Sequence, residues 1–280
     1  MQSKNPIFTR AEGFNGRNGQ SAPAYPSPAQ WSTGSPSGPS THAQPGLDQG
    51  RMTIDSVVQK TGLTLGIVVV VAALTWVLTG DITSDAALGN LYAISMVGAL
   101  GGFALAMVNS FKKVVSPALV MAYAAVEGLF VGAFSKAMEA MFAGPDQGGL
   151  VVGAVLGTVA AVGGTLAAYK FFDIRVGQKF RTWVIGAMFG FVALSLLDFV
   201  LRFFGADFGF NGFGTMGLIS SALGLGLGVL MLILDFDFVE RGIEAGLPER
   251  ESWRAAFGLT VTIIWIYIEI LRLIAILRGD

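Results

Sequence analysis

The chain has 280 residues, of which 53% are hydrophobic and only 13% are charged, and its mean hydropathy is +0.63. This composition excludes an ordinary soluble domain and indicates an integral membrane protein that contacts a lipid bilayer. The formal net charge of −1 argues against nucleic acid as a partner, and the absence of cysteine excludes a disulfide framework, a thiolate metal site and a cysteine nucleophile.

Residues 1–59 are rich in Gly, Pro and Ser and contain few apolar side chains, so we expect a disordered cytoplasmic tail. The residues after Met1 lack the apolar run of a cleavable signal peptide. We therefore expect the first hydrophobic segment to act as an uncleaved anchor. The only histidine, His42, lies in this tail, where we expect it to be solvated. Residues 60–280 then form the membrane domain.

Seven apolar segments follow, each near the roughly 20 residues that a helix needs to cross hydrocarbon. Continuous runs exclude a transmembrane β-barrel, whose shorter segments alternate in polarity. The predicted fold class is an all-α integral membrane protein, a seven-transmembrane-helix bundle. The segments are Thr61–Leu78, Leu88–Val108, Pro117–Phe142, Leu150–Tyr169, Trp183–Phe204, Gly214–Phe236 and Ala255–Leu277.

The basic residues between these segments predict the orientation, because cytoplasmic loops carry the excess of Lys and Arg. Lys and Arg precede the first segment and follow the second, fourth and sixth. The other three connections carry acidic but no basic residues, although Arg202 ends the fifth segment. We therefore expect a multi-pass protein, in the cytoplasmic membrane if the source is bacterial, with its N-terminus cytoplasmic and its C-terminus outside.

Ionisable side chains at membrane depth are costly and mark functional sites by default. Eight occur here: Glu127, Lys136, Glu139, Asp198, Asp235, Asp237, Glu269 and Arg272. Of these, Lys136, Glu139 and Asp198 lie toward the outer ends of their segments, where a structural role is expected.

The two aspartates of "LILDFDFVE" cannot face one cavity, because helical side chains two residues apart point about 200° apart. Asp235 shares its face with a stripe of small residues, which favours close packing against other helices. The stripe is Gly217, Ser221, Gly224 and Gly228. We expect Asp235 to face the bundle interior, and Asp237 to lie in water where the helix leaves the membrane.

Glu127 and Glu269 are the deepest acids. Glu269 shares its helix face with small or polar residues and is expected to face the interior, although an ion pair with Arg272 three residues later is an alternative. For Glu127, the alternative is a buried hydrogen bond with Tyr123, one turn earlier. Inward carboxylates mark cation pathways and proton relays, and two that lie close together titrate as a unit. The acids thus predict a pH-sensitive cation site.

Three motifs, "MAYAAVEGLFVGAF", "LILDFDFVERG" and "IWIYIEILRLIAIL", resemble the Bax inhibitor-1/YccA family of transmembrane Bax-inhibitor-motif proteins, particularly its bacterial branch. The resemblance covers about Asp55 to Arg278. It implies a seven-helix bundle with a central last helix and a pH-sensitive Ca²⁺ leak. It also implies that Asp235 and Glu269 form a proton-sharing gate that binds the Ca²⁺, with Glu127, Asp237 and Arg272 as further cavity or latch residues.

The sequence departs from this family in three ways. The second acid is Glu rather than the usual Asp, and the connection "ERGIEAGLPERES" between the two acids is longer. The arginine that clamps the acids in the family has no clear match, and the candidates are Lys112, Lys113 and Arg272. Direct contact between Asp235 and Glu269 is therefore not implied by spacing alone.

Other functions stay open. The resemblance also implies an interaction protein that modulates a membrane-anchored ATP-dependent protease, and the same acids suit proton-coupled transport of a small solute. An intramembrane peptidase is disfavoured, because the membrane segments contain no histidine and Asp198 and Asp235 lie at opposite depths. We expect neither enzyme activity nor a cofactor.

Overall fold

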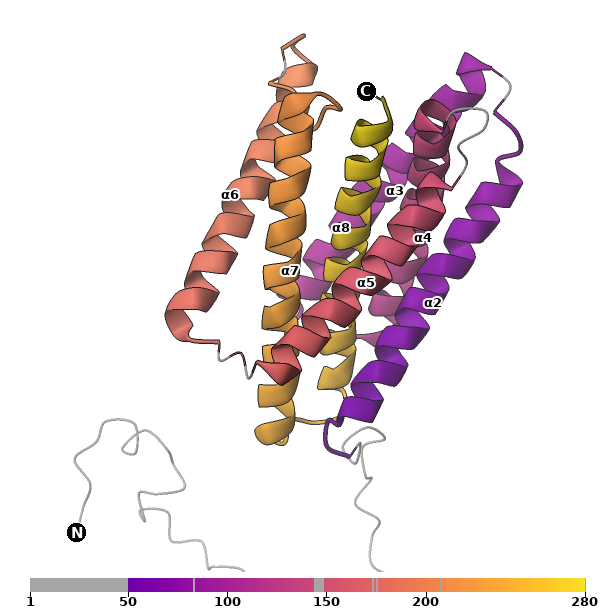
Figure 1. The fold of residues 1–280 in the computed structure, drawn as a ribbon. Helices are drawn as coiled ribbons and strands as arrows, with labels where there is room; N and C mark the ends of the chain where they lie inside the picture. The colour runs from indigo at the N-terminus through magenta and orange to yellow at the C-terminus, as the bar shows by residue number, and fades with distance from the viewer. Residues whose placement is uncertain are drawn as a thin grey trace, which may run out of the picture. The chain divides into compact units, whose positions relative to one another are not determined.

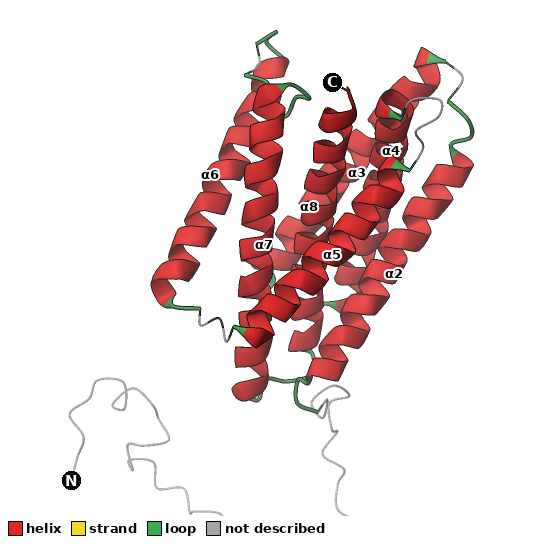
Figure 2. Cartoon of the chain, in the orientation of Figure 1, coloured by secondary structure: helices red, strands yellow, loops and turns green. Residues whose placement is uncertain are grey.

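The computed structural model describes residues 50–82, 84–143, 149–172, 174, 176–206 and 208–279. It confirms the seven predicted helices, and no strand forms among the described residues (Figures 1 and 2). Each helix is long and apolar enough to cross a membrane. The helices are α2 (Ile54–Leu78), α3 (Asp85–Phe111), α4 (Pro117–Phe142), α5 (Leu150–Phe171), α6 (Gln178–Arg202), α7 (Thr215–Glu244) and α8 (Glu251–Gly279).

The predicted tail boundary at residue 59 is too late. Helix α2 begins at Ile54 because Thr53 caps it: the Ser56 amide donates to the Thr53 hydroxyl and the Thr53 amide donates to the Ser56 hydroxyl, both at 3.1 Å. Before the cap, the Met52 amide donates to the Leu247 carbonyl at 2.8 Å. Residues 50–59 are thus part of the folded unit, and the rest of the predicted tail, 1–49, lies outside the described residues.

Helix α8 forms the centre of the bundle, as the family resemblance implied. Its backbone packs against α2, α4, α5 and α7. In its most apolar stretch 67% of the residues are buried, against 17% in α2 and in α6. Figure 1 shows α8 in yellow, flanked by α7 and the crossing helices α4 and α5. A helix buried on all sides can carry polar groups only where neighbouring helices supply partners.

Helix α6 lies at the periphery. Among the described elements its backbone comes close only to that of α7, and the backbone of α3 comes close only to that of α4. Figure 1 shows α6 at one edge of the bundle. Side chains of both outer helices line the cavity described below.

One end of the bundle gathers the basic connections. The Arg250 guanidinium donates to the Val115 carbonyl at 2.9 Å, and that of Arg254 donates to the Lys113 carbonyl at 2.9 Å. Lys60, before the apolar part of α2, pairs with Glu249 at 2.9 Å. These contacts join the start of α2, the α3–α4 connection and the α7–α8 connection, so three of the four connections in which Lys and Arg gather lie at one end.

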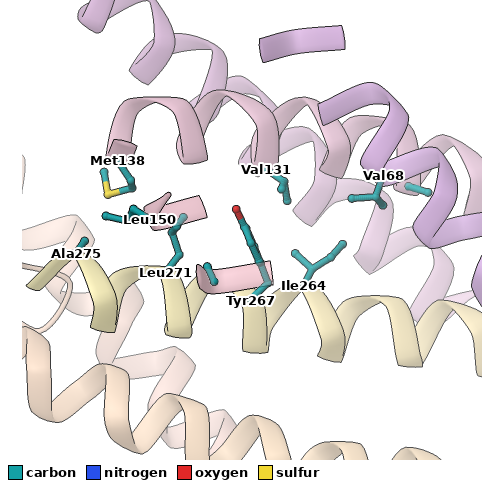
Figure 3. Close-up of a cluster of buried hydrophobic side chains, with 10 residues drawn as sticks. Val68, Val131, Met138, Leu150, Ile264, Tyr267, Leu271 and Ala275 are labelled. Carbon is teal, nitrogen blue, oxygen red and sulfur yellow. The ribbon is translucent and has the colours of Figure 1, made fainter. Parts of the chain in front are cut away.

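The largest hydrophobic core cluster joins α8 to α2, α4 and α5 (Figure 3). Its polar member is Tyr267, which reaches from α8 toward α4, where its hydroxyl lies 2.7 Å from that of Ser135. Close packing here depends on glycine, because a Cβ added at Gly132 would lie 2.5 Å from the Ala72 carbonyl oxygen of α2. The α2–α4 crossing is thus a small-residue contact of the kind common in membrane bundles.

This crossing gives a testable contrast between two glycines. Gly132→Ala is expected to lower the free energy of unfolding by about 1–3 kcal/mol, because the methyl group must push α2 away. Gly163→Ala, on α5, is expected to cause no loss, because an added Cβ there meets nothing within 4 Å. Titration with SDS in mixed micelles, followed by circular dichroism, measures both. Equal shifts in the two variants would contradict the role given to the crossing.

Candidate functional site

A buried ion pair on α8 forms one wall of the site. An Arg272 guanidinium nitrogen lies 3.2 Å from a Glu269 carboxylate oxygen, and the two residues are only 8% and 4% exposed. A second Arg272 nitrogen donates to the carbonyls of Phe210 (3.1 Å) and Gly212 (3.3 Å). The ion pair that the sequence left as an alternative therefore forms, and it also ties α8 to the α6–α7 connection.

The small-residue stripe of α7 admits the Glu269 side chain. A Cβ added at Gly224 would lie 2.6 Å from a Glu269 carboxylate oxygen, so only glycine leaves room there. The Trp265 indole nitrogen donates to the Gly224 carbonyl at 3.0 Å. The Ser221 hydroxyl, fully buried on α7, approaches the Glu269 carboxylate without completing a hydrogen bond of good geometry. Glu269 thus faces the interior, as predicted.

A cavity of about 680 Å³ brings Glu269 and Arg272 together with Glu127 of α4. Its walls come from α3, α4, α6, α8 and the α6–α7 connection. They are mostly aromatic or aliphatic, with polar side chains from Ser195, Arg202 and Asn211 as well. The backbones of α3 and α6 do not come close to each other, and Tyr92 of α3 and Phe191 of α6 line the cavity between them.

Glu127 is the carboxylate of this cavity that lacks a basic partner among the described residues. Tyr123, one turn earlier on α4, lies close enough to interact with the Glu127 carboxylate, the alternative that the sequence left open. A Cβ added at Gly102 of α3 would lie 2.6 Å from a Glu127 carboxylate oxygen, so α3 also approaches it closely. Glu269 is compensated by Arg272, whereas the charge of Glu127 is not balanced by any described cation.

The structure does not join Asp235 to Glu269. Asp235 faces α8, as predicted, but its carboxylate accepts a hydrogen bond from Thr262 at 2.5 Å and does not line the cavity. Thr262 and Glu269 are seven residues apart on α8, about 10 Å along the axis. The register of the long α7–α8 hairpin explains the gap: Asp235 lies opposite Gly258 and Thr262, whereas Glu269 lies opposite Gly224.

The prediction for Asp237 was wrong. Its side chain is only 7% exposed and is held by two arginines, Arg181 at 2.7 Å and Arg241 at 2.9 Å. Arg241 also donates to the Val176 carbonyl at 2.6 Å. The residues that lead into α6 cover the face of α7 that the sequence assigned to water. Asp237 therefore fastens α7 to the start of α6 and takes no part in the cavity.

Lys136 and Glu139 lie near the other end of the bundle, and each caps the end of a neighbouring helix. Lys136 donates to the Trp76 carbonyl (2.7 Å), the Thr79 hydroxyl (3.0 Å) and the Gly80 carbonyl at the end of α2. Glu139 accepts from the amides of Gly149 (2.8 Å) and Val151 (2.9 Å) at the start of α5. The structural role expected for these residues is confirmed.

Asp198 organises the connection between α6 and α7. Its carboxylate accepts from the backbone amides of Phe208 (3.0 Å) and Asn211 (3.1 Å) and pairs with Arg202 at 3.3 Å. The Asn211 side chain forms two hydrogen bonds of 2.7 Å with Ser195. Its amide nitrogen donates to the Ser195 carbonyl, and its amide oxygen accepts from the Ser195 hydroxyl. The sequence did not identify Arg202 and Asn211 as cavity residues. The four-residue spacing of Asp198 and Arg202 was the available signal.

The described residues contain no group of three or more His, Cys, Asp or Glu that could hold a metal ion. Asp235 and Glu269, the predicted Ca²⁺ ligands, do not share a site and cannot bind one ion together. A stable Ca²⁺ site needs six to eight oxygen ligands. The cavity offers the carboxylates of Glu127 and Glu269. Lys112 and Lys113 are exposed, and of the three candidate clamp residues only Arg272 pairs with a predicted site acid.

Comparison with known proteins adds one finding. The family model described as "Bax inhibitor 1 like" matches residues 5–279, almost the whole chain. No curated protein is similar enough to the chain to count as a match.

Proposed function

Because the chain belongs to the Bax inhibitor 1 like family, we propose that it is a pH-sensitive membrane pathway for cations, Ca²⁺ among them. The observation that carries the proposal is the cavity in which Glu127 and Glu269 face the same space at membrane depth. One of these carboxylates has no described counter-charge and so attracts a cation. Protonation of either carboxyl changes the charge of the cavity, which makes the attraction depend on pH.

The pathway continues past a constriction on α8. From the cavity, Glu269 leads toward the Trp265 and Ile266 side chains, which pack against Gly228 of α7. Asp235 and Thr262 lie beyond this contact. We take the basic end of the bundle as cytoplasmic, by the excess of Lys and Arg in its connections. The cavity then faces outward, Asp235 lies on the cytoplasmic side, and the packing between them is the closed gate.

Calcium entry into proteoliposomes at pH 6, 7 and 8 tests the proposal. The native protein should pass Ca²⁺ faster than empty liposomes do. Glu127→Gln should reduce the flux about tenfold, the equivalent of losing roughly 1.4 kcal/mol of attraction, and should flatten its pH dependence. Glu269→Gln and Asp235→Asn, compared in the same assay, locate the acid that sets the pH dependence.

The matched control is Glu244→Gln, which removes an exposed carboxylate at the end of α7 and should leave the flux unchanged. Circular dichroism shows whether each variant is folded, which matters most for Glu269→Gln because that change leaves Arg272 without its carboxylate. No flux above that of empty liposomes from folded native protein would overturn the proposal.

A second function is favoured by one contact. The Met52 amide donates to the Leu247 carbonyl, and the Glu249 amide donates to the Gly50 carbonyl at 2.7 Å. The segment before α2 is therefore fastened to the α7–α8 connection. A partner such as a membrane-anchored protease that bound residues 1–49 would act on the helices that carry the acids. For this function, removal of residues 1–49 should abolish partner binding, and Glu127→Gln should not.

A further inference from the structure

A second cavity lies between α2 and α5 on the opposite side of α8 from Glu269. The backbones of α2 and α5 do not come close to each other, and a groove of about 520 Å³ separates them. Its edges are exposed, with Val69 and Val159 at 65% and 66% exposure. We propose that this groove binds one acyl chain of a membrane phospholipid.

The chemistry of the lining suits hydrocarbon. Most of the lining residues are Val, Leu, Ile or Ala. The three hydroxyl groups in them already have partners: those of Ser135 and Tyr267 lie 2.7 Å apart, and that of Thr158 donates to the Ala154 carbonyl at 2.7 Å. An apolar chain can therefore fill the groove without leaving any of these hydroxyl groups unsatisfied.

The length of the groove distinguishes an acyl chain from a helix. On α2 it extends from Leu65 to Val77, twelve residues or about 18 Å of helix axis. Half of a bilayer's hydrocarbon core is about 15 Å thick, so the groove spans one leaflet. A transmembrane helix from a second copy would need a contact face across both leaflets, whereas a single acyl chain ends where the groove ends.

A lysine and a tryptophan mark one end of the groove. The Lys136 ammonium lies 5.8 Å from the centre of the Trp76 ring, which lines the groove. Its described partners are carbonyls and a hydroxyl rather than a carboxylate. Glu139, one turn later, is engaged by two backbone amides at the start of α5. Lysine and tryptophan are both common where a membrane protein meets the head groups, so this end of the groove lies at the level of the membrane interface.

The groove also meets the acidic cavity. Ile264 lines both, and Figure 3 shows Ile264 and Tyr267 extending from α8 toward Val68 and Val131. An acyl chain in the groove therefore contacts a side chain that forms the wall of the cavity on its other side. This binding site does not depend on the proposed cation flux, and its test uses no flux measurement.

Native mass spectrometry of the purified protein, with palmitoyl-oleoyl phosphatidylglycerol as the probe, tests the proposal. The native protein should retain one phospholipid per chain. Ala73→Phe places a ring in the groove from an exposed position on α2 and should weaken retention about tenfold. Ala104→Phe is the matched control, because Ala104 is an exposed residue of α3 that lines neither cavity, and it should retain lipid as the native protein does.

Equal retention in all three proteins, or none in the native protein, would overturn the proposal. A native dimer that Ala73→Phe converts to monomer would overturn it as well, because a second copy would then be the occupant. If Ala73→Phe does not fold, Val155→Trp fills the groove from the α5 wall and replaces it. Lipid retained by folded Val155→Trp at the native level would count against the site in the same way.

Discussion

Arg272→Met should lower the free energy of unfolding by about 3–5 kcal/mol, the cost typical of removing one partner from a buried ion pair. The substitution leaves the Glu269 carboxylate buried without its cation, and it leaves the carbonyls of Phe210 and Gly212 without their guanidinium donor. Methionine replaces the aliphatic part of the arginine side chain with an unbranched apolar chain and removes the guanidinium. SDS titration in mixed micelles, followed by circular dichroism, measures the loss.

The double variant Glu269→Gln/Arg272→Met separates charge from packing. Because the glutamine is neutral, the double variant should lose less stability than the sum of the two single changes, with a coupling of about 0.5–3 kcal/mol. Strict additivity would mean that the pair contributes no mutual stabilisation. Arg272 would then act only through the two carbonyls of the α6–α7 connection.

Asp198→Ala is expected to lower the free energy of unfolding by about 2–4 kcal/mol, because several buried donors lose their acceptor at once. The side chain of Asp198 is inaccessible to solvent. The α6–α7 connection covers it, whereas the helices at the centre of the bundle do not. We therefore expect a smaller loss than for Arg272→Met. The loss should appear first as faster hydrogen exchange at the amides of Phe208 and Asn211.

Asp198→Asn is the conservative control. Asparagine keeps an acceptor oxygen for the amides but loses the charge that pairs with Arg202, so about half of the alanine effect should remain. If asparagine and alanine were equally destabilising, the ion pair would dominate. If the asparagine variant were as stable as the native protein, the amide hydrogen bonds alone would account for the role of Asp198.

The fold was largely predictable because hydropathy reports directly on membrane spans. Both ends of α4, Pro117 and Phe142, were predicted to the residue, since a proline starts the helix and the apolar run ends with it. The ends of α7 and α8 were not, because these helices continue beyond the membrane to Glu244 and from Glu251, in polar sequence where hydropathy carries no signal. Caps such as Thr53 were the available local signal at the start of α2.

The site was predictable in part, for a different reason. A helical wheel ranks the faces of one helix, and it placed Asp235 and Glu269 inward correctly. It cannot show what a neighbouring helix supplies, so it missed the two arginines that bury Asp237. Nor does it fix the axial register between two helices, which decides that Glu269 shares a cavity with Glu127 rather than with Asp235.

The central position of α8 has a consequence for biosynthesis. This helix is the last of the seven to leave the ribosome, yet α2, α4, α5 and α7 all pack around it. Until α8 inserts, the Ser135 hydroxyl lacks its contact with Tyr267, and the Gly224 carbonyl lacks the hydrogen bond from Trp265. Contacts between the first and last helices also impose a high contact order, which slows folding. The bundle is therefore completed only after α8 has been synthesised, and a chain truncated before α8 would be exposed to quality control.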